Sequence, residues 1–219
     1  KEVMKNKLSK ETKRTFIITT IICFIPIIIG ACLYNRLPDT IATHWDFKGN
    51  ANGFSSKFVG VIVFPGILAV LNIFTPFMFS IDPKYTNAGE KIKAVIQWIF
   101  PITSVFCTTI TLGSALGYDI NVELFAPIFA GILFTVIGNF LPKTKQTYTI
   151  GIRVPWTLNS EENWNKTHRM AGYLWVVCGI LFIASAFLPE SEILYTILLC
   201  VIIFVPIIYS YVIYRKENK

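Results

Sequence analysis

Six long apolar stretches constrain the fold of this chain more than any other feature of its sequence. The length of each is close to that of a helix that crosses a bilayer core, which needs about 20 residues. None contains an Asp, Glu, Lys, Arg or His. The stretches are Phe16–Tyr34, Val59–Ile81, Ala94–Leu116, Leu124–Leu141, Met170–Leu188 and Ile193–Tyr214. The sequence therefore predicts an all-α polytopic membrane protein with six transmembrane helices.

Composition and charge placement support this class and predict an orientation. Only 15% of residues are charged, against about 25% in an average soluble domain. Of the 20 Lys and Arg residues, all but Arg36, Lys48 and Lys57 fall on one side of the predicted membrane. The positive-inside rule places that side, with both termini, in the cytoplasm. We attribute the net charge of +7 to the Lys and Arg residues that set the orientation in the membrane and that attract anionic membrane lipids. We do not interpret it as a sign of direct binding of nucleic acid.

The loop lengths divide the predicted spans into two halves. A basic N-terminus (1–15) precedes a first half (16–116) with a long outer loop (35–58). The second half (117–219) has a long inner loop (142–169). Both halves follow the order span, long loop, span, short loop, span. Because each half has three spans, the second half enters the membrane with the opposite orientation. This rhythm is compatible with the inverted three-plus-three repeat of some transporters.

The third stretch carries a polar stripe. Gln97, Ser104, Thr108 and Thr111 recur at helical spacing on one face. One interpretation is a substrate path in a small transporter or lipid-handling permease. The other is a seam where helices pack closely and hydroxyl groups bond across. The stripe contains no charged residue, which favours the seam.

The sequence shows no pattern typical of catalysis or metal binding. The apolar stretches contain no ionisable acid or base for proton or ion coupling. The two histidines, His44 and His168, fall in loops on opposite sides of the predicted membrane. Neither a zinc-protease motif, a nucleophile elbow nor a phosphate-binding glycine loop is present. We therefore expect no enzyme, no cofactor and no metal site.

The outer loop contains LPDTIATHWDFKGNANGFSSK, from Leu37 to Lys57. The run Gly49–Gly53 is a strong turn signal, so one interpretation is a structured hairpin. The other is a docking surface for a partner outside the cell, centred on His44 and Trp45.

The inner loop contains GIRVPWTLNSEENWNKTHRMAG, from Gly151 to Gly172. Thr147–Ile152 alternates and favours a strand, and the residue before Pro155 is expected to be extended. Asn159 and Glu162 have the spacing of a capping box.

A helix that begins near Ser160 would continue into the fifth stretch. It would place Trp164 and His168 on one face and pair Glu162 with Lys166 at i, i+4. In one interpretation it lies at the membrane surface, with Trp156 and Trp164 at the level of the headgroups.

Both long loops resemble segments of a known family. LPDTIATHW followed by GFSSK resembles the DUF1648 module. IGIRVPWTLNSEENWNKTHRMAGYLWVVCG resembles the signature of the SdpI bacteriocin-immunity family. The resemblance implies a multi-span protein of Gram-positive bacteria that protects the producing cell from a secreted peptide toxin. It also implies a signalling receptor that holds a small cytoplasmic DNA-binding autorepressor at the cell membrane.

The resemblance assigns candidate residues to these two roles. His44, Trp45 and Asp46 are candidates for the toxin-facing surface. The candidates for the cytoplasmic signalling surface are Arg153, Pro155, Trp156, Trp164 and Arg169. The expected function is an integral-membrane immunity protein; the alternative is the small transporter or permease that would use the polar stripe.

Overall fold

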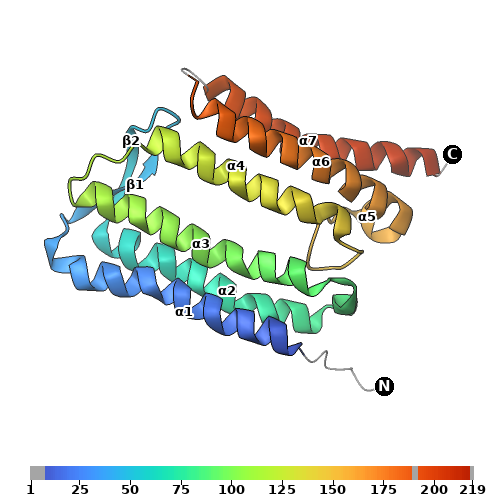
Figure 1. Ribbon diagram of the computed structural model, residues 1–219, viewed down its shortest axis with the longest axis horizontal. Helices are drawn as coiled ribbons and strands as arrows, with labels where there is room; N and C mark the ends of the chain where they lie inside the picture. The colour runs from blue at the N-terminus through green and yellow to red at the C-terminus, as the bar shows by residue number, and fades with distance from the viewer. Residues whose placement is uncertain (1–7, 189–191, 218–219) are drawn as a thin grey trace. The chain divides into compact units, whose positions relative to one another are not determined.

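The computed structural model describes residues 8–188 and 192–217, and it is mostly helical (Figure 1). Six of its helical segments are long and apolar enough to cross a membrane, which confirms that prediction. The long helices are α1 (Lys10–Leu33), α2 (Phe64–Ile81), α3 (Glu90–Ala115), α4 (Val122–Phe140), α6 (Glu161–Ser185) and α7 (Glu192–Glu217). Short helical turns are η1 (Tyr34–Arg36), η2 (Val59–Val63), η3 (Tyr85–Asn87), η4 (Leu141–Lys143) and α5 (Pro155–Asn159).

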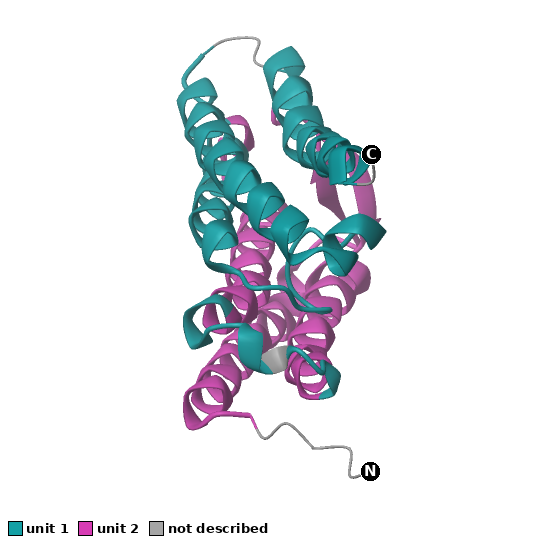
Figure 2. Ribbon diagram, turned by 90° about the vertical axis from the view of Figure 1, so that its right-hand side faces the viewer, with its two compact units in different colours: residues 1–6, 81–92, 124–219 teal, residues 7–80, 93–123 magenta. Residues whose placement is uncertain are grey.

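The helices divide into two compact units (Figure 2). Unit 2 holds residues 7–80 together with 93–123, and unit 1 holds, among the described residues, 81–92 together with 124 onwards. The segment 81–92 connects α2 to α3, yet its contacts place it in unit 1. The predicted orientation of the termini, the half boundary after residue 116 and the inverted repeat stay predictions.

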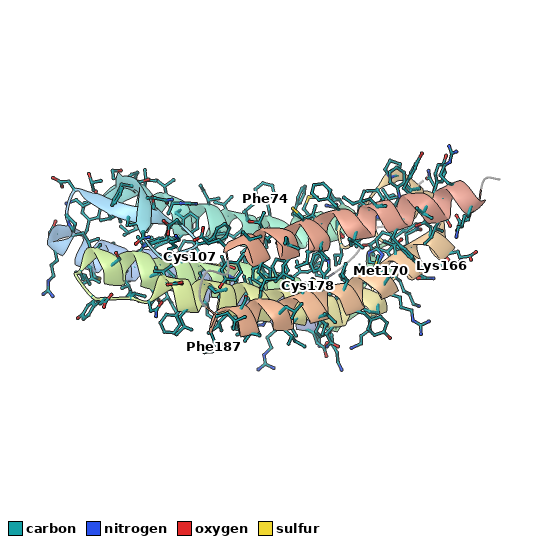
Figure 3. All side chains as sticks on the ribbon, turned by 90° about the horizontal axis from the view of Figure 1, so that it is seen from above. Phe74, Cys107, Lys166, Met170, Cys178 and Phe187 are labelled. Atoms are coloured by element: carbon teal, nitrogen blue, oxygen red, sulfur yellow. The ribbon has the colours of Figure 1, made fainter. Side chains whose placement is uncertain are left out.

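The outward faces of the helices are apolar, as a lipid solvent requires. Phe74 is 54% exposed and Phe187 69% exposed, and Figure 3 shows both side chains directed away from the helices. Such large exposed apolar area is rare in soluble monomers. It follows that these faces suit the hydrocarbon core of a bilayer.

In unit 1, α4 and α6 meet through glycines. A Cβ atom on Gly138 would lie 2.9 Å from the carbonyl oxygen of Gly172. A Cβ atom on Gly131 would lie 2.5 Å from the carbonyl oxygen of Gly179. Only glycine permits such close backbone approach, and small residues are the usual means by which membrane helices pack. The Gly172 end of this seam packs against Pro142, where the 142–169 loop begins.

In unit 2, the first long loop forms an antiparallel hairpin of β1 (Thr40–Trp45) and β2 (Ala51–Ser56). The turn signal therefore predicted the hairpin correctly. The carboxylate of Asp46 closes the turn by accepting hydrogen bonds from the backbone amides of Lys48 and Asn50, both at 2.9 Å. Asp46 and Asn50 also pair through their backbones, at 2.9 Å.

Three local predictions for the second long loop were wrong. Thr147–Ile152 is irregular and not a strand, because its polar groups bond to side chains instead of to a neighbouring strand. Asn159 does not cap α6; the cap is Ser160, whose hydroxyl accepts from the amide of Asn163 at 3.1 Å. Trp164 does not lie at a surface, since its side chain is fully buried.

Two further predictions for this loop were correct. Val154 is extended before Pro155, with φ −108° and ψ 157°. The helix that begins after Ser160 continues without a break to Ser185, and Lys166 pairs with Glu162 on it.

Candidate functional site

A buried carboxylate organises the 142–169 loop of unit 1. Asp82 follows the last residue of α2 and is only 2% exposed. Its Oδ2 accepts hydrogen bonds from the amides of Tyr148 and Thr149, both at 3.0 Å, and from the Thr149 hydroxyl at 2.7 Å. Its Oδ1 accepts from the amide of Lys84 at 2.8 Å. A carboxylate removed from water needs such donors. We call this arrangement the Asp82 clasp.

Gln146 extends the Asp82 clasp to α5. Its side-chain amide donates to the carbonyl oxygens of Thr157 and Leu158, each at 2.8 Å. Its side-chain oxygen accepts from the Lys84 ammonium, and its backbone oxygen accepts from the side-chain amide of Asn87 at 3.0 Å. Gln146 is thus a buried bridge between segment 81–92 and α5.

Trp164 and His168 form the floor of the loop. The indole N–H of Trp164 donates to the carbonyl oxygen of Thr144 at 2.7 Å, and its ring stacks on His168 with centroids 4.0 Å apart. The amide of Ile152 donates to Nε2 of His168 at 2.9 Å, and Nδ1 lies 2.8 Å from the carbonyl oxygen of Trp164. Because an amide can only donate, Nε2 is the acceptor and the imidazole is neutral, with its proton on Nδ1. Both ring nitrogens are therefore hydrogen-bonded to backbone groups.

Gly151 lies directly on this floor. Its φ is +114°, and a Cβ atom there would lie 2.4 Å from Nε2 of His168 and 2.8 Å from the Trp164 ring. Both the backbone conformation and the space require glycine. The first glycine of the predicted signature is therefore a packing requirement of the loop.

The residues from Arg153 to Trp156 form an outward-facing turn. The guanidinium of Arg153, which is exposed, donates to the carbonyl oxygen of Tyr148 at 2.7 Å. The indole N–H of Trp156 donates to the hydroxyl of Ser210 on α7 at 2.7 Å. The Trp156 ring stacks on Tyr214 at 6.1 Å between centroids. This turn joins the loop to the last part of α7.

The predicted signalling residues therefore separate into two groups. Arg153, Pro155 and Arg169 are exposed and Trp156 is half-buried. Trp164 has no exposed surface, so it can act on a partner only through the loop that it supports. Sequence reasoning missed Asp82 and Gln146, which hold the exposed group in place.

The predicted toxin-facing residues lie together on the β1–β2 hairpin. His44 is exposed, and its Nδ1 lies 2.6 Å from the side-chain oxygen of Asn52 on the opposite strand. Trp45 is half-buried. Asp46 shapes the turn, as described above, so its carboxylate oxygens are already occupied by the hairpin.

We expect the hairpin turn to loosen in acid. The backbone amide of Asn50 is the main cause that lowers the pKa of Asp46 below its usual value. A carboxyl group with a lowered folded pKa stabilises the fold above its unfolded pKa of about 3.9, and this contribution is lost as the pH falls through the folded pKa. Hydrogen exchange of the Lys48 and Asn50 amides should accelerate in Asp46→Ala at neutral pH. Unchanged exchange in this variant would show that the carboxylate does not hold the turn.

The polar stripe lies on α3 as its spacing predicted, and it is buried. Gln97 and Ser104 are 0% exposed, Thr108 3% and Thr111 7%. Within residues 8–188 and 192–217, the side-chain polar atoms of Gln97, Ser104 and Thr108 have no hydrogen-bond partner. The side-chain amide of Asn72 bonds to Thr20 at 3.0 Å, not to the stripe. The transporter interpretation of the stripe stays a prediction.

Comparisons with known proteins match both halves of the chain. Residues 143–210 match the SdpI/YfhL protein family, and residues 21–69 match a domain of unknown function, DUF1648. The chain is 28% identical over 204 residues to the immunity protein SdpI of Bacillus subtilis (strain 168). The matched region covers 92% of this chain and 97% of that protein. No solved structure matches the chain. The first match spans the loop with Trp164, and the second includes the hairpin. The chain therefore matches the SdpI/YfhL family in its second half and DUF1648 in its first, and it resembles an immunity protein over nearly its full length.

Proposed function

We propose that the chain is an integral-membrane immunity protein that gives its cell resistance to a secreted peptide toxin. The observation that carries this proposal is the similarity to an immunity protein over nearly the full length of both chains. The six apolar helices supply the membrane location. The excess of Lys and Arg on one side supports cytoplasmic termini, and it leaves the β1–β2 hairpin on the side from which a secreted toxin approaches.

The second part of the proposal is a signalling role for the loop that carries the Asp82 clasp. Arg153 and Pro155 are exposed and Trp156 is half-buried, so part of this segment is accessible to a cytoplasmic partner. Arg and Trp are the residues that most often dominate protein interfaces. The proposed partner is a small cytoplasmic DNA-binding repressor, and nearby cations such as Arg169 contact anionic lipid headgroups.

A toxin challenge tests the first part. The chain is expressed in a sensitive strain that lacks its own immunity proteins, and survival is recorded after addition of the peptide toxin countered by the Bacillus subtilis relative. Survival above that of cells carrying the empty vector supports immunity. Killing equal to that of the vector control, with the protein verified in the membrane, would reject it.

A pair of substitutions tests the signalling part. Arg153→Ala and Trp156→Ala should each weaken recruitment of a fluorescent repressor to the membrane by at least about tenfold, because truncated Arg and Trp anchors typically cost that much. Resistance to toxin should be retained. Ser210→Ala is the matched control, because it removes the hydrogen bond to Trp156 and leaves the indole in place.

Loss of resistance and of recruitment together, with less protein in the membrane, would instead show that Arg153 and Trp156 serve folding. Recruitment equal to that of the unchanged protein would remove both residues from the signalling surface.

A further inference from the structure

One face of the β1–β2 hairpin carries large exposed aromatic side chains. Phe54 is 62% exposed, and Phe58, just after the strand, is 53% exposed. Ser56 is exposed as well, whereas Ser55 and Lys57 are half-buried. Because successive side chains of a strand point to opposite faces, Phe54 and Ser56 lie on one face and Ser55 on the other. The exposed face is therefore both aromatic and polar, and it ends at Phe58, where the chain enters η2 and α2.

The other face of the hairpin packs on the helices of unit 2. Ile41 of β1 is the register partner of Ser55, so their side chains share this face. Ile41 is 2% exposed, and a Cβ atom on Gly60 would lie 2.6 Å from its Cδ1 atom. It belongs to a buried apolar cluster with Val61 and Leu112. The hairpin is thus fixed to these helices by the face opposite to the aromatic one.

The hairpin lies at the ends of α1 and α2 (Figure 1), at the level where spans begin. Near its base it packs on Gly60, the second residue of the span Val59–Ile81. At its tip, a Cβ atom on Gly49 would lie 2.9 Å from the backbone nitrogen of Glu123, the second residue of the span Val122–Lys143. An upright strand of six residues would instead rise about 20 Å. The hairpin therefore lies along the membrane surface, at the depth of the lipid headgroups.

The aromatic face adjoins the lipid-facing surface of α2. Val59, which follows Phe58, is 41% exposed. Further large apolar side chains recur along α2 at steps of three and four residues, which places them on one helical face. They are Phe64 (42% exposed), Ile67 (53%), Leu71 (45%) and Phe74 (54%). This stripe suits the hydrocarbon core, so lipid that covers it also reaches the entry to α2 beside Phe58.

We propose that the β1–β2 hairpin is seated in the headgroup layer of the leaflet on its side of the membrane, with Phe54 and Phe58 inserted toward the acyl chains. The partner of this face is phospholipid. Apolar faces that carry aromatic side chains bury at the boundary between headgroups and acyl chains, and the hydroxyl of Ser56 suits the hydrated headgroups. The inference depends neither on which side of the membrane holds the hairpin nor on the proposed immunity function.

Photocrosslinking of the full chain in vesicles of phosphatidylcholine and phosphatidylglycerol tests the contact. The photoreactive residue p-benzoylphenylalanine is placed at Phe54 or at Phe58, and lipid adducts are detected by mass spectrometry. Phe74, 54% exposed on α2, is the lipid-facing reference, and Phe79, 2% exposed on the same helix, is the buried control. We expect the yield of lipid adducts at positions 54 and 58 to match that at Phe74 and to exceed that at Phe79.

Two outcomes of this experiment would overturn the proposal. In the first, position 54 forms no lipid adduct although Phe74 does, which would show that the aromatic face meets water. In the second, position 54 forms crosslinks between two copies of this chain in place of lipid adducts, which would make the face a protein interface.

Hydrogen exchange in the same vesicles tests whether the lipid contact holds the hairpin. The amides of Asp46 and Lys57 donate across it to the carbonyl oxygens of Asn50 and Asp39, each at 2.9 Å. We expect Phe54→Ser to accelerate their exchange about tenfold, the effect of losing a partly buried aromatic side chain. Phe54→Trp should keep the parent's rates, because tryptophan is favoured at the headgroup level.

The pair of substitutions separates lipid anchoring from packing within the protein. Equal exchange in Phe54→Ser and the unchanged chain would show that lipid at Phe54 does not hold the hairpin. Acceleration by Phe54→Trp as large as that by Phe54→Ser would show that the ring fits a site in the protein instead. Either result would contradict the proposal.

Discussion

Asp82→Asn is expected to detach the 142–169 loop from the segment after α2. The asparagine amide would place a donor where the carboxylate now accepts from Tyr148 and Thr149, so buried N–H groups would face each other. Disrupting a buried charged hydrogen-bond network typically costs about 3 kcal/mol or more. We expect a lower apparent Tm in detergent and faster cleavage by trypsin after Lys145 and Arg153.

The matched control is Asp39→Asn. The Asp39 side chain is exposed and pairs with Lys57 at 3.0 Å, and pairs at the surface contribute little to stability. This variant should keep the parent's Tm and its resistance to trypsin. Equal behaviour of Asp82→Asn and Asp39→Asn would show that the Asp82 clasp does not stabilise the loop.

Gly151→Ala is expected to be at least as damaging. The substitution combines a left-handed backbone strain of about 1–3 kcal/mol with overpacking of about 1–3 kcal/mol, because the new methyl group would meet His168 and Trp164. We predict that the protein accumulates poorly in the membrane. Any purified fraction should show altered tryptophan fluorescence, since the ring of Trp164 would be displaced.

Substitution of Gly117 by alanine separates the cost of backbone strain from the cost of overpacking. Its φ is +85°, but a Cβ atom there would have no neighbour within 4 Å. Gly117→Ala should therefore show the backbone cost alone, about 1–2 kcal/mol. If Gly151→Ala loses no more stability than Gly117→Ala, the floor formed by Trp164 and His168 can yield, and the loop is less tightly packed than we describe.

The parts of the fold that the sequence predicts well are those specified by local pattern. Six charge-free apolar stretches are enough to place six helices, since only helices and closed barrels satisfy the backbone in lipid and runs of about 20 continuous apolar residues fit a helix rather than a barrel strand. The hairpin follows from the turn signal at Gly49–Gly53. The start of α6 was predicted within one residue, because Ser160 and Asn159 are both good caps and only the backbone decides between them.

The parts that were missed depend on contacts between distant residues. Asp82 bonds to Thr149, 67 residues further along the chain, and a lone aspartate after an apolar span gives no local signal of that partner. Trp164 illustrates the opposite error. A tryptophan near the end of a membrane helix is typical of the headgroup region, but the bond to Thr144 and the stack on His168 bury it completely.

The helical segment that precedes Asp82 connects the hairpin to the Asp82 clasp. From Val59 to Ile81 the chain is continuously helical over 23 residues, a rod of about 35 Å at 1.5 Å per residue. One end is joined to β2, whose last residue is Ser56, and the other is followed at once by Asp82. A displacement of the hairpin along the helix axis would therefore reach the Asp82 clasp through one continuous helical segment, without a relay of side chains between them.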